Sequence, residues 1–262
     1  MKKTTLIVVT AMGLLLLAAC KKDKSLEDAG KVPPVRDYNL VLKFRAKADT
    51  NLLKFDSLYT NFFDEPYKVN KFKFYIHNIR FFNTDSSYEV STGKTKHYLI
   101  DFADSATTLI KLTVRPYVYN RIGITIGVDS VLNVSGAQAG ALDPANGMFW
   151  TWNSGYIMAK LEGTSPVANV AGNKFEYHIG GFSGVDNTLR SPVLLFPFGQ
   201  TVQLKQDGLT ELVIDANVAA WFYNPHDISL ATNPVITTPG PLARQVADNY
   251  SKMFTVISVV NQ

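Results

Sequence analysis

The sequence is short of cysteine: Cys20 is the single one in 262 residues. A domain built from the residues after it can hold no disulfide, no thiolate metal site and no cysteine nucleophile. Charged residues are also few, at 18%, whereas apolar residues make up 46%. This balance excludes a disordered, collagen-like or coiled-coil protein. No long hydrophobic run follows the first 20 residues, so we expect no internal transmembrane helix.

The motifs of several large enzyme classes are missing as well. The chain has no glycine-rich phosphate loop, no serine nucleophile elbow and no His-Glu-x-x-His pair. Its net charge of +4 falls to +2 without Lys2 and Lys3, which is too small and too dispersed for binding nucleic acid. We therefore expect no enzymatic activity and no nucleic-acid partner. A hydrolase remains a minor alternative without any constellation of residues to support it.

The N-terminus is typical of a bacterial lipoprotein signal. Met1-Lys2-Lys3 is followed by an apolar stretch over residues 6–19, which is too short to span a bilayer comfortably. That stretch ends in Leu17-Ala18-Ala19-Cys20, the form of a lipobox. We predict a signal peptide over residues 1–19 and lipidation of Cys20 with diacylglycerol and palmitate-type acyl chains. Several acyl chains would anchor the protein permanently in the membrane.

The residues after the lipobox indicate where the anchored protein resides. Lys21, rather than aspartate, follows Cys20, so the sequence carries no signal for retention in the inner membrane. We expect an outer-membrane lipoprotein, with the periplasmic or surface-facing leaflet left open. Residues 20–36 are charged, end near Pro33-Pro34, and read as a flexible tether. A single domain is expected over residues 37–262.

The body of the chain reads as strands separated by turn residues. Alternating apolar and polar residues, as in Tyr38, Leu40, Leu42 and Phe44, indicate half-buried strands. Further strands are predicted over residues 69–82, 98–102, 108–114, 117–128, 148–161 and 174–181, with a hairpin over 201–205 and 209–215. Helices are expected only at residues 217–222 and 242–254. This pattern predicts an all-β fold, an antiparallel β-sandwich of immunoglobulin-like or jelly-roll-like type with one or two short helical insertions.

The sequence has four histidines, His77, His97, His178 and His226, which lie far apart along the chain. Alternation places His77 on the strand face opposite Phe72, Phe74 and Ile76, and His178 opposite Phe175, Tyr177 and Ile179. A single histidine without a motif is usually an ordinary hydrogen-bonded residue. Imidazoles from adjacent strands can nevertheless converge on copper in a sandwich.

The densest aromatic stretch covers residues 147–163. If it is one strand, Trp150 and Trp152 share a face with Met148, Tyr156 and Met158. A core strand that packs two indoles is the plain interpretation of this row. A redox-active or metal-proximal aromatic row is the other.

Several segments carry a resemblance to a known family. They are Phe72-Lys-Phe-Tyr-Ile-His-Asn-Ile-Arg, Ile124-Thr-Ile-Gly-Val-Asp-Ser-Val-Leu-Asn, Ala141-Leu-Asp-Pro-Ala-Asn-Gly-Met-Phe-Trp-Thr-Trp-Asn-Ser-Gly-Tyr, Lys160-Leu-Glu-Gly, Tyr177-His-Ile-Gly, Leu212-Val-Ile-Asp-Ala-Asn and Trp221-Phe. Over nearly the whole chain after the tether, these segments resemble the MbnP-like family. The Met-x-Trp-x-Trp-x-x-Gly-Tyr block is the specific part.

The resemblance implies a periplasmic copper-binding protein associated with methanobactin. In similar proteins a di-haem peroxidase-like partner enzyme oxidises a tryptophan to kynurenine, which holds copper together with histidines. By this resemblance Trp150 and Trp152 match the tryptophan pair, and His178 matches a histidine strand of the family. His77 and His226 are alternative sources of a second imidazole. We therefore expect copper at His178 with His77 or His226, beside an oxidised tryptophan.

A second interpretation needs no metal. An aromatic-rich, lipidated β-sandwich could bind a glycan or a protein partner through its loops without catalysis. The intact mass of the protein would distinguish these two interpretations, because kynurenine changes the mass of a tryptophan residue.

Overall fold

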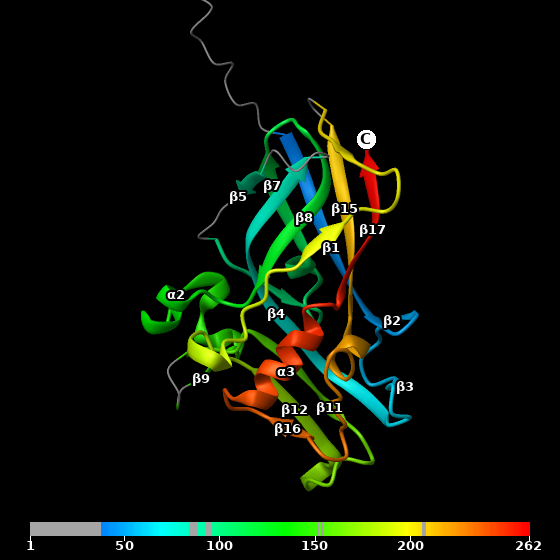
Figure 1. Ribbon diagram of the computed structural model, residues 1–262, viewed down its shortest axis with the longest axis vertical. Coiled ribbons are helices and arrows are strands. Elements are labelled where there is room, and N and C mark those ends of the chain that lie inside the picture. The colour runs from blue at the N-terminus through cyan, green and yellow to red at the C-terminus, as the bar shows by residue number, and fades with distance from the viewer. Residues whose placement is uncertain (1–37, 84–88, 93–95, 151, 153–154, 206–207) are drawn as a thin grey trace, which may run out of the picture. The chain divides into compact units, whose positions relative to one another are not determined.

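The computed structural model describes residues 38–83, 89–92, 96–150, 152, 155–205 and 208–262. Asp37–Gln262 form one compact unit, whose strands and helices are labelled in Figure 1. The predicted signal peptide, Cys20 and the tether lie outside the described residues. Within the described ranges, no helix is both long enough and apolar enough to cross a membrane.

The first sheet has five strands and is built around the N-terminal strand of the domain. Its order is β17 (Phe254–Asn261), β15 (Leu209–Asn217), β1 (Tyr38–Ala48) and β2 (Asn51–Leu52), and β7 (Leu109–Val114) pairs with β1 as well. β1 runs parallel to β15, while the pairings of β1 with β2 and β7 and of β15 with β17 are antiparallel. The sheet is therefore mixed.

The second sheet has ten strands and one long spine, β4 (Pro66–Asn83), which crosses Figure 1 in cyan. Because β4 has 18 residues, it pairs with five different strands along its length. The other strands are β3 (Leu58–Thr60), β5 (Glu89–Thr92), β6 (Tyr98–Asp101), β8 (Val118–Ile126), β11 (Ala159–Thr164), β12 (Lys174–Ile179), β13 (Val193–Leu195), β14 (Val202–Gln203) and β16 (Val235–Ile236).

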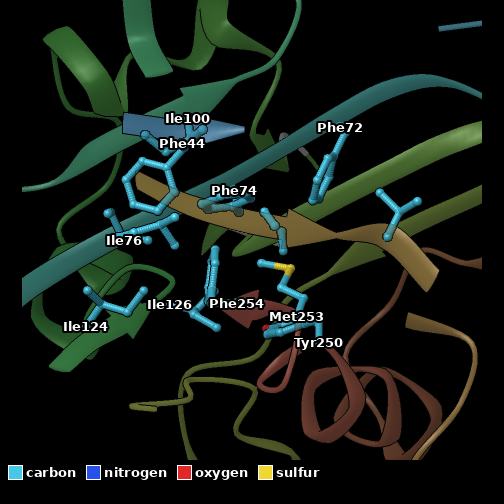
Figure 2. Close-up of a cluster of buried hydrophobic side chains, with 14 of the residues drawn as sticks. Phe44, Phe72, Phe74, Ile76, Ile100, Ile124, Ile126, Tyr250, Met253 and Phe254 are labelled. Atoms are coloured by element: carbon cyan, nitrogen blue, oxygen red, sulfur yellow. The ribbon is translucent and has the colours of Figure 1, made fainter. Parts of the chain in front are cut away.

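The main core lies between the two sheets. Phe74 of β4 meets Phe44 of β1 and Phe254 of β17 edge to face, with ring centroids 6.0 and 5.2 Å apart, respectively. Figure 2 shows these rings among the buried side chains. Such aromatic pairs add to the free energy gained by burying the rings. The predicted all-β sandwich is confirmed, with two parallel strand pairs, β1–β15 and β12–β16, within it.

Helices are short and few among the described residues. The α-helices are α2 (Ser130–Val134) and α3 (Pro241–Tyr250). The helix predicted over residues 242–254 ends at Tyr250, because the chain turns there and enters β17 at Phe254. The turn predicted at 217–222 is the 3₁₀ helix η6 (Val218–Trp221). The other 3₁₀ helices are η1 (Ser105–Thr108), η2 (Gly140–Leu142), η3 (Pro144–Asn146), η4 (Ala171–Asn173) and η5 (Gly184–Asp186).

Two strand predictions were wrong in detail. The stretch 148–161 is not one strand: β9 (Phe149–Trp150) and β10 (Gly155–Tyr156) pair with each other, and β11 begins only at Ala159. Local alternation cannot reveal such a reversal of the chain. The stretches 201–205 and 209–215 do not form a hairpin, because β14 pairs with β8 whereas β15 is paired on both edges, with β1 and β17.

The connection between β8 and β11 creates a second apolar cluster. Described residues of this connection pack on part of the outer face of the second sheet, against Tyr75 of β4. This outer cluster consists of Tyr75, Val128, Leu142, Met148, Trp150, Tyr156, Ile157 and Met158, all buried. Its consequence is that one stretch of the outward face of β4, at Tyr75 and His77, becomes interior.

Candidate metal centre

Three potential metal ligands meet under the β8–β11 connection: His77, His97 and Asp129. One ligand atom from each lies within 4.8 Å of the others. The two imidazoles are stacked, with ring centroids 4.5 Å apart and planes inclined by 23°. His97 Nε2 lies 3.2 Å from Asp129 Oδ2. This is the one such group of histidine, cysteine and acidic residues among the described parts of the chain.

Strand pairing places the two histidines together. β6 runs antiparallel to β4 with Ile76 opposite Tyr98, so the residues one step further along, His77 and His97, also come to lie side by side. Both histidines are buried, each with 7% of its surface exposed. His77 stands on the face of β4 opposite Phe74 and Ile76, as alternation predicts, but the β8–β11 connection covers it.

Asp129 is positioned by the start of helix α2. It is the N-cap residue, and its Oδ1 accepts a hydrogen bond from the backbone N–H of Leu132 at 3.1 Å. This leaves Oδ2 directed to His97. An N-cap aspartate is held firmly because it satisfies a helix donor that would otherwise lack a partner. With its side chain 35% exposed, Asp129 is also the solvent side of the centre.

The backbone at Gly127 holds the His77 ring. His77 Nδ1 lies 3.0 Å from the Gly127 carbonyl oxygen. Gly127 has a φ of +110°, and a Cβ there would lie 2.9 Å from Met158 Sδ, so only glycine suits this position. Met158 Sδ in turn accepts the N–H of Val128 at 3.1 Å. The thioether of Met158 therefore supports the backbone that forms one side of the site.

The chemistry of His77 suits a metal ligand. Burial lowers its pKa, and the neighbouring His97 lowers it further, so the imidazole is neutral at pH 7. Since a carbonyl can only accept, Nδ1 of the neutral ring carries the proton and donates it to Gly127. The lone pair is then on Nε2. A metal-bound histidine whose other ring nitrogen donates to a carbonyl is the usual arrangement in metalloproteins.

The three side chains fit a borderline divalent metal. Two imidazoles and a carboxylate, at bond lengths of about 2 Å, would place donor atoms about 3–4 Å apart around one ion. Donor atoms already within 4.8 Å need only a small closure. Copper binds such a nitrogen and oxygen set more tightly than the other divalent first-row metals, zinc included.

The structure places His178 elsewhere. Its Nε2 lies 2.8 Å from Glu162 Oε1, and Glu162 also pairs with Lys71 at 2.7 Å. Through β11, His178 stands level with Lys73 of β4, two strands away and four residues short of His77. At ~3.3 Å per residue and ~4.8 Å per strand, the two histidines are roughly 16 Å apart along the sheet. They are not brought together.

Glu162 gives the His178 cluster a measurable role in acid stability. Burial alone would raise the pKa of Glu162, but hydrogen bonds from His178 and Lys71 and the charge of Lys160 outweigh it and hold the pKa at about 2, against an ordinary 4.5. A depressed carboxyl pKa stabilises the fold above pH 4.5, and that contribution is lost as the pH falls towards 2.

We therefore expect Glu162→Gln to lower the free energy of unfolding at pH 7 by about 2 kcal/mol and to flatten its decline between pH 4.5 and 2. Urea unfolding at several pH values measures this. Glu176→Gln is the matched control, since Glu176 lies opposite Glu162 on β12. An equal acid dependence in Glu162→Gln and the unaltered protein would contradict the assignment.

His226 is likewise engaged with a carboxylate. Its Nε2 lies 3.1 Å from Asp248 Oδ2, and Asp248 Oδ1 accepts from Arg190 Nε at 2.8 Å. His226 is not part of the metal-ligand group found among the described residues. Its contacts join the loop after η6 to helix α3, which is a structural role.

The two tryptophans of the specific motif lie at the edge of the outer cluster. Trp150 is buried and Trp152 is 62% exposed, with ring centroids 5.7 Å apart and planes inclined by 45°. Trp150 belongs to the same cluster as Tyr75, two residues before His77, and Val128, directly before Asp129. Both indoles also line a cavity of about 430 Å³.

Sequence reasoning missed His97 and Asp129. His97 precedes a short strand, and nothing local marks it as a ligand. The pairing of residues 73–76 with 98–101 sets His97 beside His77. This pairing could have identified His97 as a ligand, but the register of the two strands cannot be read from the sequence alone. Asp129 before Ser130 is an ordinary helix-start signal, and its second oxygen becomes available only in the folded chain.

These observations define a β-sandwich protein with a buried candidate metal centre on the outer face of one sheet. Residues 37–239 match the MbnP family model, and the chain belongs to the MbnP family. Among solved structures, MbnP from Methylosinus trichosporium is similar at 14% identity with a TM-score of 0.48, over 74% of this chain and 80% of that one. No curated protein matches significantly.

Proposed function

We propose that this protein binds one copper ion at His77, His97 and Asp129 and serves in copper acquisition or homeostasis. The observation that carries the proposal is the meeting of two stacked, buried imidazoles with a carboxylate. A metal ion would use both rings, and the exposed side of Asp129 gives it a path of entry.

The proposal also covers the surroundings of the site. Lipidation at Cys20 would hold the protein in the cell envelope as an outer-membrane lipoprotein, and the protein itself would not be an enzyme.

A di-haem peroxidase-like partner would oxidise Trp150 or Trp152. With hydrogen peroxide as the oxidant, opening the indole ring adds two oxygen atoms and gives N-formylkynurenine. Hydrolysis by water then releases the formyl carbon as formate and leaves kynurenine, about 4 Da heavier than tryptophan. The exposure of Trp152 makes it the more accessible of the two to a partner enzyme.

Copper titration with a competing chelator, together with electron paramagnetic resonance, tests the metal proposal. We expect one Cu²⁺ per chain, with hyperfine coupling to two imidazole nitrogens. Protein made with and without the partner enzyme should be compared, and intact mass should be measured for each. The absence of tight copper binding in both preparations would refute the proposal.

A second function has its own support in the structure. Phe62 and Tyr223 are exposed and stacked with ring centroids 3.8 Å apart, beside a cavity of about 500 Å³ that is also lined by Asn61, Asn217 and Lys252. Exposed rings next to amide groups suit a glycan or a protein partner. If copper binding fails, this non-catalytic binding role is the better proposal.

A further inference from the structure

The cavity beside the tryptophan pair has the composition of a ligand site. Its volume of about 430 Å³ is that of a small-molecule pocket. Trp150, Trp152, Tyr156 and Phe182 contribute aromatic surface to it, and Asp186 is the one charged residue among the described residues that line it. The tilt of 45° between the two indoles gives the cavity two non-parallel aromatic walls.

Most polar groups around this cavity are already hydrogen-bonded within the protein. The Tyr156 hydroxyl donates to the Leu142 carbonyl at 2.9 Å and accepts from the N–H of Gln138 at 3.0 Å. The Asn133 amide donates to the Val128 carbonyl at 2.7 Å and accepts from the N–H of Tyr156 at 2.8 Å. These two residues therefore present mainly ring surface and shape to a ligand.

Asp186 is different. Its Oδ1 is buried, and no hydrogen-bond partner for it exists within the described ranges. The guanidinium of Arg244 lies nearby, but it donates to the Val185 carbonyl at 3.0 Å. Oδ1 itself is shielded from solvent, so Asp186 would act on a cation in the cavity through the negative charge of its carboxylate, which no hydrogen bond at Oδ1 offsets.

The segment that carries Asp186 is held in place from several sides. Thr188 donates both its N–H and its hydroxyl to the Gly181 carbonyl, each at 2.9 Å. The Tyr250 hydroxyl of helix α3 donates to the Thr188 carbonyl at 2.9 Å. A backbone held in this way limits how far the Asp186 side chain can move, which reduces the entropy cost of binding.

We propose that this cavity binds a small organic cation with a quaternary or methylated ammonium group. The faces of the indoles attract a cation whose charge is spread over methyl groups, and Asp186 supplies the opposite charge. A neutral apolar ligand would contact the same aromatic walls but would leave the negative charge of Asp186 without a positive charge beside it. None of the three metal-centre residues lines the cavity, but Trp150 and Trp152 do, so the proposal applies to the protein with both indoles unoxidised.

Choline, with its uncharged carbon isostere dimethylbutanol, tests the proposal on metal-free protein made without the partner enzyme. Tryptophan fluorescence reports binding, because Trp221, the third indole, is fully buried in the main core and gives a constant background. We expect saturable binding of choline and at least about tenfold weaker binding of dimethylbutanol.

Variants locate the binding site. Asp186→Asn keeps the size of the side chain and should weaken choline binding about tenfold or more, and Trp152→Ala should do the same. Asp227→Asn, at an exposed aspartate outside the cavity, is the matched control and should not change it. Equal affinity for choline and dimethylbutanol, unchanged binding in Asp186→Asn, or no saturable binding at millimolar concentration would each overturn the proposal.

Discussion

Replacing His97 by alanine is expected to weaken copper binding by about a hundredfold or more. Loss of a residue that merely orients a metal ligand already costs about 10–100-fold in affinity, and a direct ligand should cost at least the upper end of that range. His77→Ala should have an effect of the same size. Nδ1 of His77 donates to the Gly127 carbonyl, so Nε2 carries the lone pair that can bind a metal. Chelator competition followed by visible or paramagnetic resonance spectra measures both.

Three further variants test whether the loss of copper binding is specific to the proposed ligands. Asp129→Asn should cost only about tenfold, since asparagine is as good an N-cap for helix α2 and retains an oxygen ligand. His178→Ala is the control with an equal loss of imidazole, and we expect copper affinity within about twofold of the unaltered protein. His97→Gln guards against a folding defect because it keeps a polar side chain of similar size. Loss of copper in His178→Ala alone would move the metal site to β12.

Gly163→Ala is expected to be the most damaging single methyl addition in the sheet. Gly163 follows the irregular pairing between β11 and β4, and a Cβ there would lie 1.8 Å from the Lys68 carbonyl oxygen and 2.6 Å from the Phe175 ring. Backbone cannot move aside as the end of a flexible side chain can, so the strands would have to separate. We expect a loss of about 3 kcal/mol or more in the free energy of unfolding.

A second strand glycine provides the control for this substitution. A Cβ at Gly123 would lie 3.1 Å from Arg80 Nη2 and 3.2 Å from the Phe82 ring, and both are side chains. Gly123→Ala should therefore cost less than about 1 kcal/mol. Urea unfolding followed by circular dichroism compares the two variants, with the slope checked for two-state behaviour. Equal shifts of the midpoint would mean that backbone crowding at Gly163 does not limit stability.

The cell-envelope prediction depends on residues outside the described ranges. Cys20→Ala should release the protein from the membrane fraction, because the acyl chains on Cys20 supply the membrane affinity. Sedimentation of the variant with membranes at high salt would show that lipidation is not the anchor.

Local pattern was sufficient for much of the fold. Alternation along β4 and β12 correctly separated the core face, with Phe72, Phe74 and Phe175, from the face that carries His77 and His178. Side chains alternate with a period of two in any strand, so this follows from neighbouring residues alone. The tryptophan motif likewise identified the family, which the match over residues 37–239 confirms.

The metal centre and the cavity depend on contacts between residues distant in the sequence. His97 lies beside His77 only because of the register of β6 on β4, and Asp129 joins them only because the β8–β11 connection covers that part of the sheet. Trp150 and Trp152 differ in burial because the chain reverses between β9 and β10 instead of continuing as one strand. By itself the sequence determined most of the longer strands, though not β17, together with their buried faces and the family. Strand register and long connections, which are set by packing across the whole domain, decided which polar side chains meet.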